Sequence, residues 1–183
     1  MTKLFSQITP LQKQALIFNA IVRIFLPLCL FFNPLLGIVV GLITDGYDYY
    51  LLVRYAKLPN SLYQYQDKIF DYYWYILIFI YSSLYITNQL VQTTLLLTFI
   101  FRSIAQAIYL YTNNESMFYY FPNIQEPIFW IYILFPLFLN QYTLLPTLIF
   151  VTTFKLFIEY YIHIIHKNPI NQFFQFFNIK TNF

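Results

Sequence analysis

Long apolar runs separated by short polar turns make up most of the chain. A helix that crosses a bilayer needs about 20 mostly apolar residues, and six runs approach or reach that length. The predicted spans are residues 16–32, 35–53, 69–86, 91–111, 128–139 and 144–165. The fifth run is short, and Pro136 lies near its end. The pattern therefore predicts an all-α integral membrane protein with six transmembrane helices, built as a single domain over residues 1–183.

The first residues combine apolar and charged side chains ahead of the first run. Residues 1–15 hold Leu, Ile and Phe together with Lys3, Lys13 and several glutamines. That mixture is typical of a helix that lies in the membrane interface. The apolar run begins too late for a cleaved signal peptide, and no small-residue cleavage site follows it. We therefore expect an amphipathic interfacial helix over residues 1–15.

Positive charges occur on alternate connections between the predicted spans. One side, with both ends of the chain, carries Lys3, Lys13, Arg54, Lys57, Lys68, Lys167 and Lys180. The opposite turns, at residues 33–34, 88–89 and 140–141, contain no charged residue. Lysine and arginine concentrate on the cytoplasmic side of membrane proteins, so both termini are predicted to be cytoplasmic. A bacterial inner membrane and an organellar membrane, with the termini in the matrix, both fit this multi-pass pattern.

The composition excludes a soluble globular domain. Hydrophobic residues make up 60% of the chain and charged residues 9%, and the mean hydropathy is +0.58. The net charge of +3 includes no basic run, and there is no Gly-rich phosphate loop, so no nucleic-acid partner is expected. The single Cys29 lies in an apolar run, which leaves no disulfide framework.

The four aspartates of the chain fall between positions 45 and 71, next to or inside apolar runs. A carboxylate in hydrocarbon is costly, so such residues usually have a function. Asp45 and Asp48 are three apart and Asp67 and Asp71 four apart, so each pair shares a helix face. Facing carboxylates form a hard oxygen site that suits Mg²⁺, Mn²⁺ or Ca²⁺. We therefore predict a cation site at the cytoplasmic ends of spans two and three.

The stretch from Asp45 to Asp71 reads DGYDYYLLVRYAKLPNSLYQYQDKIFD. It resembles the signature of the CDP-alcohol phosphatidyltransferase superfamily, D-x2-D-G-x2-A-R-x8-G-x3-D-x3-D, which extends over the second and third of six spans. Both aspartate pairs match this spacing. Arg54 stands thirteen residues before Asp67, which is the family's own separation.

Other positions agree with the family or depart from it. The agreeing positions, in the first and fourth spans, are Asn19, Arg23, Pro27 and Arg102. The departing positions are Tyr49 and Tyr63, in place of two glycines, and Val53, in place of alanine. One extra residue also separates Asp48 from Arg54. The small residues of the family are thought to let a nucleotide approach the helix backbone, so the tyrosines indicate a remodelled nucleotide-binding site.

The resemblance implies a transfer reaction that depends on two divalent cations, Mg²⁺ or Mn²⁺. The implied metal ligands are Asp45, Asp48, Asp67 and Asp71, and Asp71 would also be the general base. The implied substrate-binding residues are Arg54, Arg102 and Lys57, with Lys68 as an alternative to Lys57. The implied partners are a CDP-linked donor, a small alcohol acceptor and membrane lipid. The family is often dimeric, so a homodimer is expected.

Each of these charged groups also has a structural interpretation. Asp67 and Asp71 could lie at a helix start, where the helix dipole favours negative charge. Arg54 could extend its side chain to the interface, and Arg102 could form an ion pair with Asp71 or Asp45.

Glu159, His163 and His166 form a second polar group on one face of the last predicted span. Their spacing suits a transition-metal site or a proton relay, and this face could also turn inward and complete the aspartate cavity. Alternatively, the histidines simply lie at the helix C-terminus, where positive charge is favoured.

Two hypotheses from different classes follow. The first is a CDP-alcohol phosphatidyltransferase-like membrane enzyme of phospholipid synthesis, which the aspartate spacing favours. The second is a non-catalytic integral membrane protein, either a degenerate relative or a small subunit of a membrane complex, which the lost glycines favour.

Overall fold

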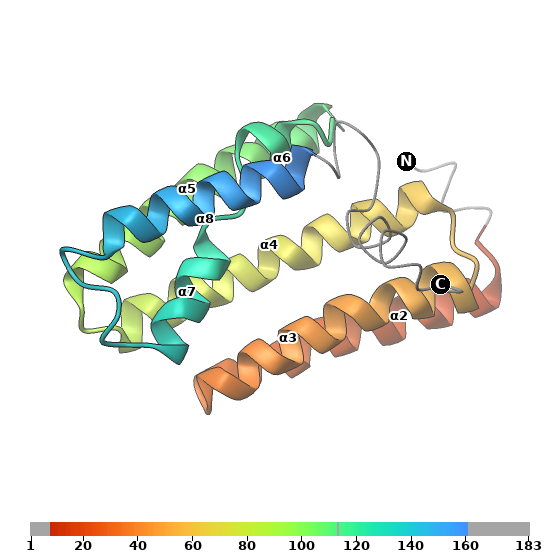
Figure 1. Cartoon of the computed structure of the whole chain (residues 1–183). Helices are drawn as coiled ribbons and strands as arrows, with labels where there is room; N and C mark the ends of the chain where they lie inside the picture. The colour runs from red at the N-terminus through yellow and green to blue at the C-terminus, as the bar shows by residue number, and fades with distance from the viewer. Residues whose placement is uncertain (1–7, 113, 161–183) are drawn as a thin grey trace, which may run out of the picture. The chain divides into compact units, whose positions relative to one another are not determined.

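The computed structural model describes residues 8–112 and 114–160. In this part of the chain the structure is helical, without strands, which confirms the predicted all-α class. The chain divides into two compact units, Met1–Tyr85 and Ile86–Phe183. Figure 1 shows the helices of each unit.

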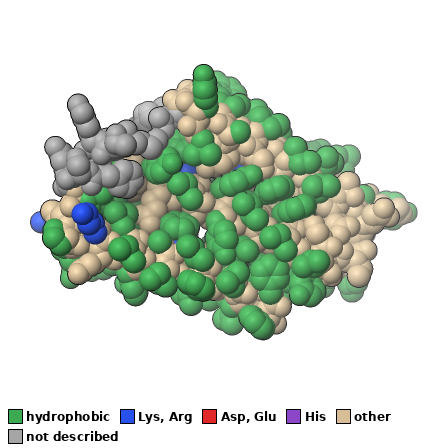
Figure 2. Space-filling view, turned by 180° about the vertical axis from the view of Figure 1, so that it is seen from behind, with side chains coloured by type: hydrophobic (Ala, Val, Ile, Leu, Met, Phe, Trp, Pro, Cys, Tyr) green, Lys and Arg blue, Asp and Glu red, His purple; other side chains and the backbone are tan. Residues whose placement is uncertain are grey.

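Three helices among the described residues are long and apolar enough to cross a membrane. They are Pro10–Phe31, Pro34–Tyr55 and Gln89–Thr112. They cover the predicted first, second and fourth spans, and the total of six spans stays a prediction. Figure 2 shows a face covered largely by hydrophobic side chains. Because Phe32, Tyr111 and Leu137 are more than nine-tenths exposed, these surfaces suit an apolar surrounding better than water.

The first unit begins with α2, Pro10–Phe25. Thr9 caps this helix in a capping box with Gln12, and Pro10 occupies its first turn. The described part of the predicted interfacial helix is therefore continuous with the first span. Pro27 cannot donate a backbone hydrogen bond, and the chain continues as a 3-10 helix, η1, over Leu26–Phe31.

A tight turn at Asn33 leads into α3, Pro34–Tyr49. The Asn33 side chain accepts hydrogen bonds from the backbone N–H groups of Leu35 and Leu36, which satisfies donors that the helix start would otherwise leave free. Gly37 faces the backbone of Leu30, so α3 and η1 approach closely. The helix then widens to a π-helix, η2, over Tyr50–Tyr55.

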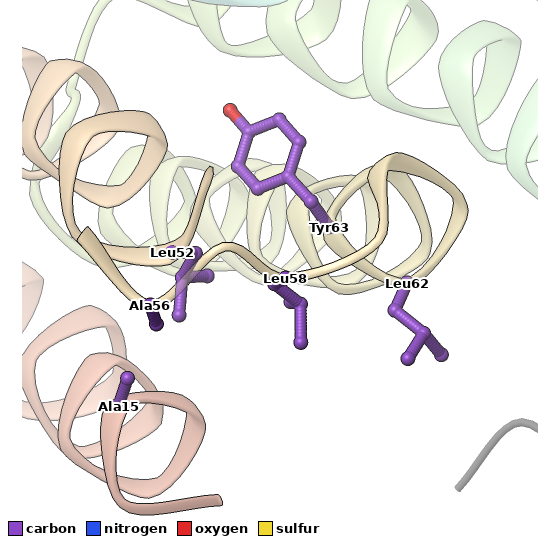
Figure 3. Packing of buried hydrophobic residues seen from close by; sticks show 6 residues of the cluster. All are labelled: Ala15, Leu52, Ala56, Leu58, Leu62 and Tyr63. Atoms are coloured by element: carbon purple, nitrogen blue, oxygen red, sulfur yellow. The ribbon is translucent and has the colours of Figure 1, made fainter. Parts of the chain in front are cut away.

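The last helix of this unit is α4, Asn60–Tyr85, and it includes most of the predicted third span. An apolar cluster joins the starts of α2 and α4 to the end of η2; its buried members are Ala15, Leu52, Ala56, Leu58, Leu62 and Tyr63. Figure 3 shows that the Tyr63 ring is directed away from Leu58 and Leu62. Its hydroxyl is thereby free to reach a polar partner elsewhere in the unit.

The second unit contains α5, α6, α7 and α8, which are Gln89–Thr112, Met117–Tyr120, Gln125–Leu134 and Leu144–Glu159. Ala105, Tyr109 and Phe118 form a buried cluster there. The predicted fifth span, residues 128–139, is wrong in its bounds. The helix there starts earlier and ends at Leu134, because Pro136 disfavours helical backbone at the preceding Phe135. Its ten residues span only about 15 Å.

Candidate cation site

The four aspartates come together in the first unit, around one arginine. Asp45 and Asp48 lie on α3, Asp67 and Asp71 lie on α4, and Arg23 reaches them from α2. The i, i+3 and i, i+4 spacings present each carboxylate pair on one helix face. The structure thus brings together the residues that the sequence predicted as metal ligands. It also places the positively charged Arg23 side chain among them.

Arg23 contacts all four carboxylates. Its Nη1 lies 2.9 Å from Asp45 Oδ1 and its Nη2 lies 3.1 Å from Asp71 Oδ1. Its Nε lies 3.6 Å from Asp48 Oδ2, and Nη2 lies 3.7 Å from Asp67 Oδ1. The side chain is only 6% exposed. A guanidinium has five N–H donors in one plane, which allows a single side chain to serve several acceptors.

Lys68 supplies a second positive charge from within α4. Its Nζ lies 2.9 Å from Asp67 Oδ2 and 3.4 Å from Asp71 Oδ2. Burial alone would lower the pKa of Lys68, but Asp71 and Asp67 outweigh that effect, and its pKa is raised. Four carboxylates with two cations leave a net charge of −2 when all are ionised.

Three of the carboxylates have the geometry of a cation site. One oxygen from each of Asp45, Asp67 and Asp71 lies within 4.8 Å of the others. Asp48 differs, because its Oδ1 accepts a hydrogen bond of 3.2 Å from the Tyr63 hydroxyl. The hard oxygen donors suit Mg²⁺, Mn²⁺ or Ca²⁺, so the residues present fit such an ion.

Two buried polar side chains, one on the helix of Arg23 and one in the carboxylate group, have atoms without a hydrogen-bond partner. Asn19 is 1% exposed, and neither its Nδ2 nor its Oδ1 makes a hydrogen bond in the part of the chain described. Asp48 Oδ2 is likewise buried without one. An unsatisfied buried polar group costs about 1–3 kcal/mol, so these atoms favour a further polar group or water at the site.

The tyrosines at the two glycine positions of the family signature pack against each other. The rings of Tyr49 and Tyr63 lie 5.6 Å apart, edge to face. Tyr63 is buried, whereas Tyr49 is 45% exposed. Tyr63 is thus fixed by two contacts, its ring against Tyr49 and its hydroxyl against Asp48.

The predicted substrate-binding residues lie in different surroundings. Arg54 and Lys57 are exposed, and among the described residues no ion pair involves either of them. Lys57 also adopts a positive φ of 52°, and its backbone carbonyl accepts a hydrogen bond from the Gln12 side chain. Both side chains remain accessible to a ligand.

Arg102 lies in the second unit and is buried there. Its Nη1 donates a 2.7 Å hydrogen bond to the Phe121 carbonyl, and its guanidinium lies 4.3 Å from the centre of the Phe118 ring. Glu159 Oε1 is 4.0 Å away. These contacts hold the α5 and α6 region together. The predicted partners of Glu159, His163 and His166, lie outside the described residues.

Sequence reasoning did not identify Arg23 as the centre of the carboxylate group. The signal was present, because an arginine inside an apolar run needs a buried partner, and all four aspartates follow within the next two predicted spans. Which of them it would meet depends on how α2, α3 and α4 pack.

We expect the ion-free protein to become less stable as the pH rises from about 4 to about 7. Burial, together with the neighbouring Asp71 carboxylate, raises the pKa of Asp67 from 3.8 to about 6, and Asp67 precedes the predicted third span. A raised carboxyl pKa gives stability that is complete below the unfolded value and is lost as the pH passes the folded value. Thermal unfolding in detergent with a chelator, followed by tryptophan fluorescence, would measure this.

The Asp67→Asn variant is the control for this pH dependence. It removes the titrating group at nearly constant size, so its melting temperature should change less between these pH values than that of the wild type. Equal pH profiles for the two proteins would contradict the assignment to Asp67.

The fold and the site together define a helical protein with membrane-length helices and a cluster of carboxylates around a buried arginine. Comparisons with protein-family models, with curated proteins and with solved structures found no match.

Proposed function

We propose that the protein is a membrane enzyme of phospholipid synthesis that resembles CDP-alcohol phosphatidyltransferases. It would move a phosphatidyl or phospho-alcohol group from a CDP-linked donor to an alcohol acceptor. The observation that carries this proposal is the convergence of four carboxylates from two helices at net charge −2. Such a group attracts a divalent cation, and a cation in turn attracts a diphosphate.

The chemistry assigns a role to each charged side chain of the site. The acceptor oxygen would form a bond to the phosphorus that carries the lipid or alcohol group, while the bond from that phosphorus to CMP breaks. Asp71 would take the hydroxyl proton of the acceptor. A cation held by Asp45, Asp67 and Asp71 would neutralise charge on the transferred phosphoryl group and on the departing CMP. Arg54 and Lys57, which are exposed, would bind phosphate oxygens.

Asp71 must change partners in such a reaction. Its two oxygens lie 3.1 Å from Arg23 and 3.4 Å from Lys68. Both oxygens are thus in contact with positively charged groups, and an acceptor hydroxyl needs access to one of them. The acceptor hydroxyl would therefore replace one of these contacts, and Lys68, with the longer distance, is the partner that separates more easily.

An apolar groove in the same unit supports a lipid substrate. It has a volume of about 290 Å³ and lies between α2 and α4; its lining residues are Leu16, Ile17, Ala20, Leu62, Tyr65, Gln66 and Ile69. Gln66 and Ile69 flank Asp67 and Lys68 in the sequence. An acyl chain in this groove would hold a lipid between α2, which carries Arg23, and α4, which carries Asp67 and Asp71.

A second candidate function is a non-catalytic membrane protein. Tyr49 and Tyr63 stand at the two glycine positions of the family signature. The hydrogen bond from Tyr63 to Asp48 and the contact between the two tyrosine rings favour this candidate. In this case the carboxylates would serve to hold Arg23 and Lys68, and so to join three helices.

Mn²⁺ binding to the purified protein in detergent, with and without CDP, tests the two candidates. The enzyme predicts Mn²⁺ binding that CDP tightens about tenfold or more, and that Asp67→Asn/Asp71→Asn weakens at least about 100-fold, because two ligand charges are lost. The matched control is Glu115→Gln/Glu126→Gln, which makes the same chemical change outside the site. Electron paramagnetic resonance of free Mn²⁺ gives the bound fraction.

The other outcomes separate the candidates. If CDP leaves the Mn²⁺ affinity unchanged, Tyr49 and Tyr63 block the nucleotide-binding site. That outcome would favour the non-catalytic protein. A complete lack of Mn²⁺ binding would contradict the enzyme.

A further inference from the structure

The charges of the cluster limit the number of cations that it can hold. Arg23 and Lys68 already neutralise two of the four carboxylates. One divalent cation would bring the total to zero. A second would leave two excess positive charges around the buried Arg23 guanidinium, which is costly unless an anion such as a diphosphate enters with it.

The positions of the oxygens agree with a single ion. One oxygen from each of Asp45, Asp67 and Asp71 lies within 4.8 Å of the others. With metal–oxygen bonds of about 2.0–2.6 Å, two ligands of one ion lie at most about 4–5 Å apart. Asp48 is not in this triad; its Oδ1 accepts the hydrogen bond from the Tyr63 hydroxyl, and its Oδ2 lies 3.6 Å from the Arg23 Nε. Arg23, within 3.7 Å of all four carboxylates, thus already supplies positive charge where a second ion would lie.

Asn19 supplies an independent sign of a ligand. It lies on α2 between Ala15, which packs in the cluster with Leu52 and Tyr63, and Arg23, which meets the carboxylates. Residues four apart share a helix face, so Asn19 lies on the face of α2 that also carries Ala15 and Arg23. Asn19 is 1% exposed, and neither polar atom of its amide makes a hydrogen bond among the described residues.

We propose that the nucleotide-free protein binds one divalent cation, through Asp45, Asp67 and Asp71, and that the Arg23 guanidinium takes the place of the second cation of the family. The Asn19 amide hydrogen-bonds water on this ion. The inference rests on the cation site of the proposed function, but not on its nucleotide or its reaction.

The test counts Mn²⁺ per protein at saturation without nucleotide, by equilibrium dialysis and electron paramagnetic resonance. The wild type should bind one ion with the spectrum of isolated Mn²⁺. Arg23→Gln should bind two, with the broadening of a coupled pair, and should hold the first at least about tenfold more tightly because a nearby positive charge is gone. Asn19→Leu should still bind one ion, with affinity reduced by about tenfold or more.

Two variants serve as controls. Lys13→Gln removes one positive charge from an exposed position on the same helix and should bind one ion. Arg23→Lys retains the charge and should also bind one ion, which keeps the test informative if Arg23→Gln fails to fold. Two ions on Arg23→Lys would contradict the role of the arginine charge.

The ion count and the response to CDP distinguish a failure of this inference from a failure of the proposed enzyme activity. One Mn²⁺ on a protein that ignores CDP would support this inference while the enzyme fails. Two Mn²⁺ on the nucleotide-free wild type would overturn it and leave the enzyme standing. No Mn²⁺ on the wild type would overturn it as well.

Discussion

Replacing Asp71 with asparagine is expected to abolish phosphotransfer while the helices keep their fold. Asparagine has nearly the same size, so the packing of α4 is retained, but its amide cannot take a proton from the acceptor hydroxyl. Loss of a general base lowers the rate by about 10²–10⁴-fold. The measurement is release of CMP from a CDP-linked lipid in mixed micelles with an alcohol acceptor, at saturating Mn²⁺.

Three checks make the Asp71 result interpretable. The Mn²⁺ content of Asp71→Asn must be measured in parallel, because the same substitution removes a predicted ligand. Circular dichroism shows whether the helices persist. The Glu115→Gln variant makes the same chemical change in the second unit and should keep the wild-type rate. Activity of Asp71→Asn within about twofold of the wild type, against the expected loss, would rule out Asp71 as the base.

Replacing Gly37 with alanine should strongly destabilise the first unit. A Cβ atom at this position would lie 2.7 Å from Leu30 Cα and 2.9 Å from Leu30 Cβ. The Leu30 backbone has little room to move, because Cys29 beside it accepts backbone hydrogen bonds from Phe32 and Asn33. Overpacking of this kind costs about 1–3 kcal/mol, and a clash with backbone belongs at the upper end. Thermal unfolding in detergent would show the loss.

Gly46→Ala is the matched control, since Gly46 lies on the same helix and, apart from its chain neighbours and the adjoining backbone of that helix, no atom lies within 4 Å of the Cβ that alanine would add. Alanine is favoured over glycine in a helix by about 1 kcal/mol, so this variant should be neutral or slightly more stable. Equal melting temperatures for Gly37→Ala and Gly46→Ala would contradict the close approach of α3 and η1.

The two glycine variants also bear on the cation site. Asp45 and Asp48 lie further along the helix that Gly37 brings against η1, so a displaced α3 would move both carboxylates away from Arg23. Gly37→Ala is therefore expected to reduce Mn²⁺ affinity together with stability, whereas Gly46→Ala should leave Mn²⁺ binding intact although it is closer to the aspartates in sequence.

The sequence by itself determined the features that depend on residues close together in the chain, which are the helices and the helix faces that the aspartates share. Apolar runs predicted helices because hydrophobic periodicity and length act locally, and three of them are long enough to cross a membrane. The spacings of Asp45 to Asp48 and of Asp67 to Asp71 predicted shared helix faces, because one turn of a helix is 3.6 residues. The end of the fifth predicted span was wrong, although Pro136 was recognised there, because helix boundaries depend on backbone geometry at single residues.

The tertiary structure alone decided which groups meet. Arg23 contacts Asp45 and Asp71 across 22 and 48 residues of chain, and within the second unit Arg102 lies 4.0 Å from Glu159. Such pairings depend on how the turn at Asn33 and the contact at Gly37 orient α2, α3 and α4. Local periodicity places a charge on a helix face, but only the packing of that face against another supplies its partner.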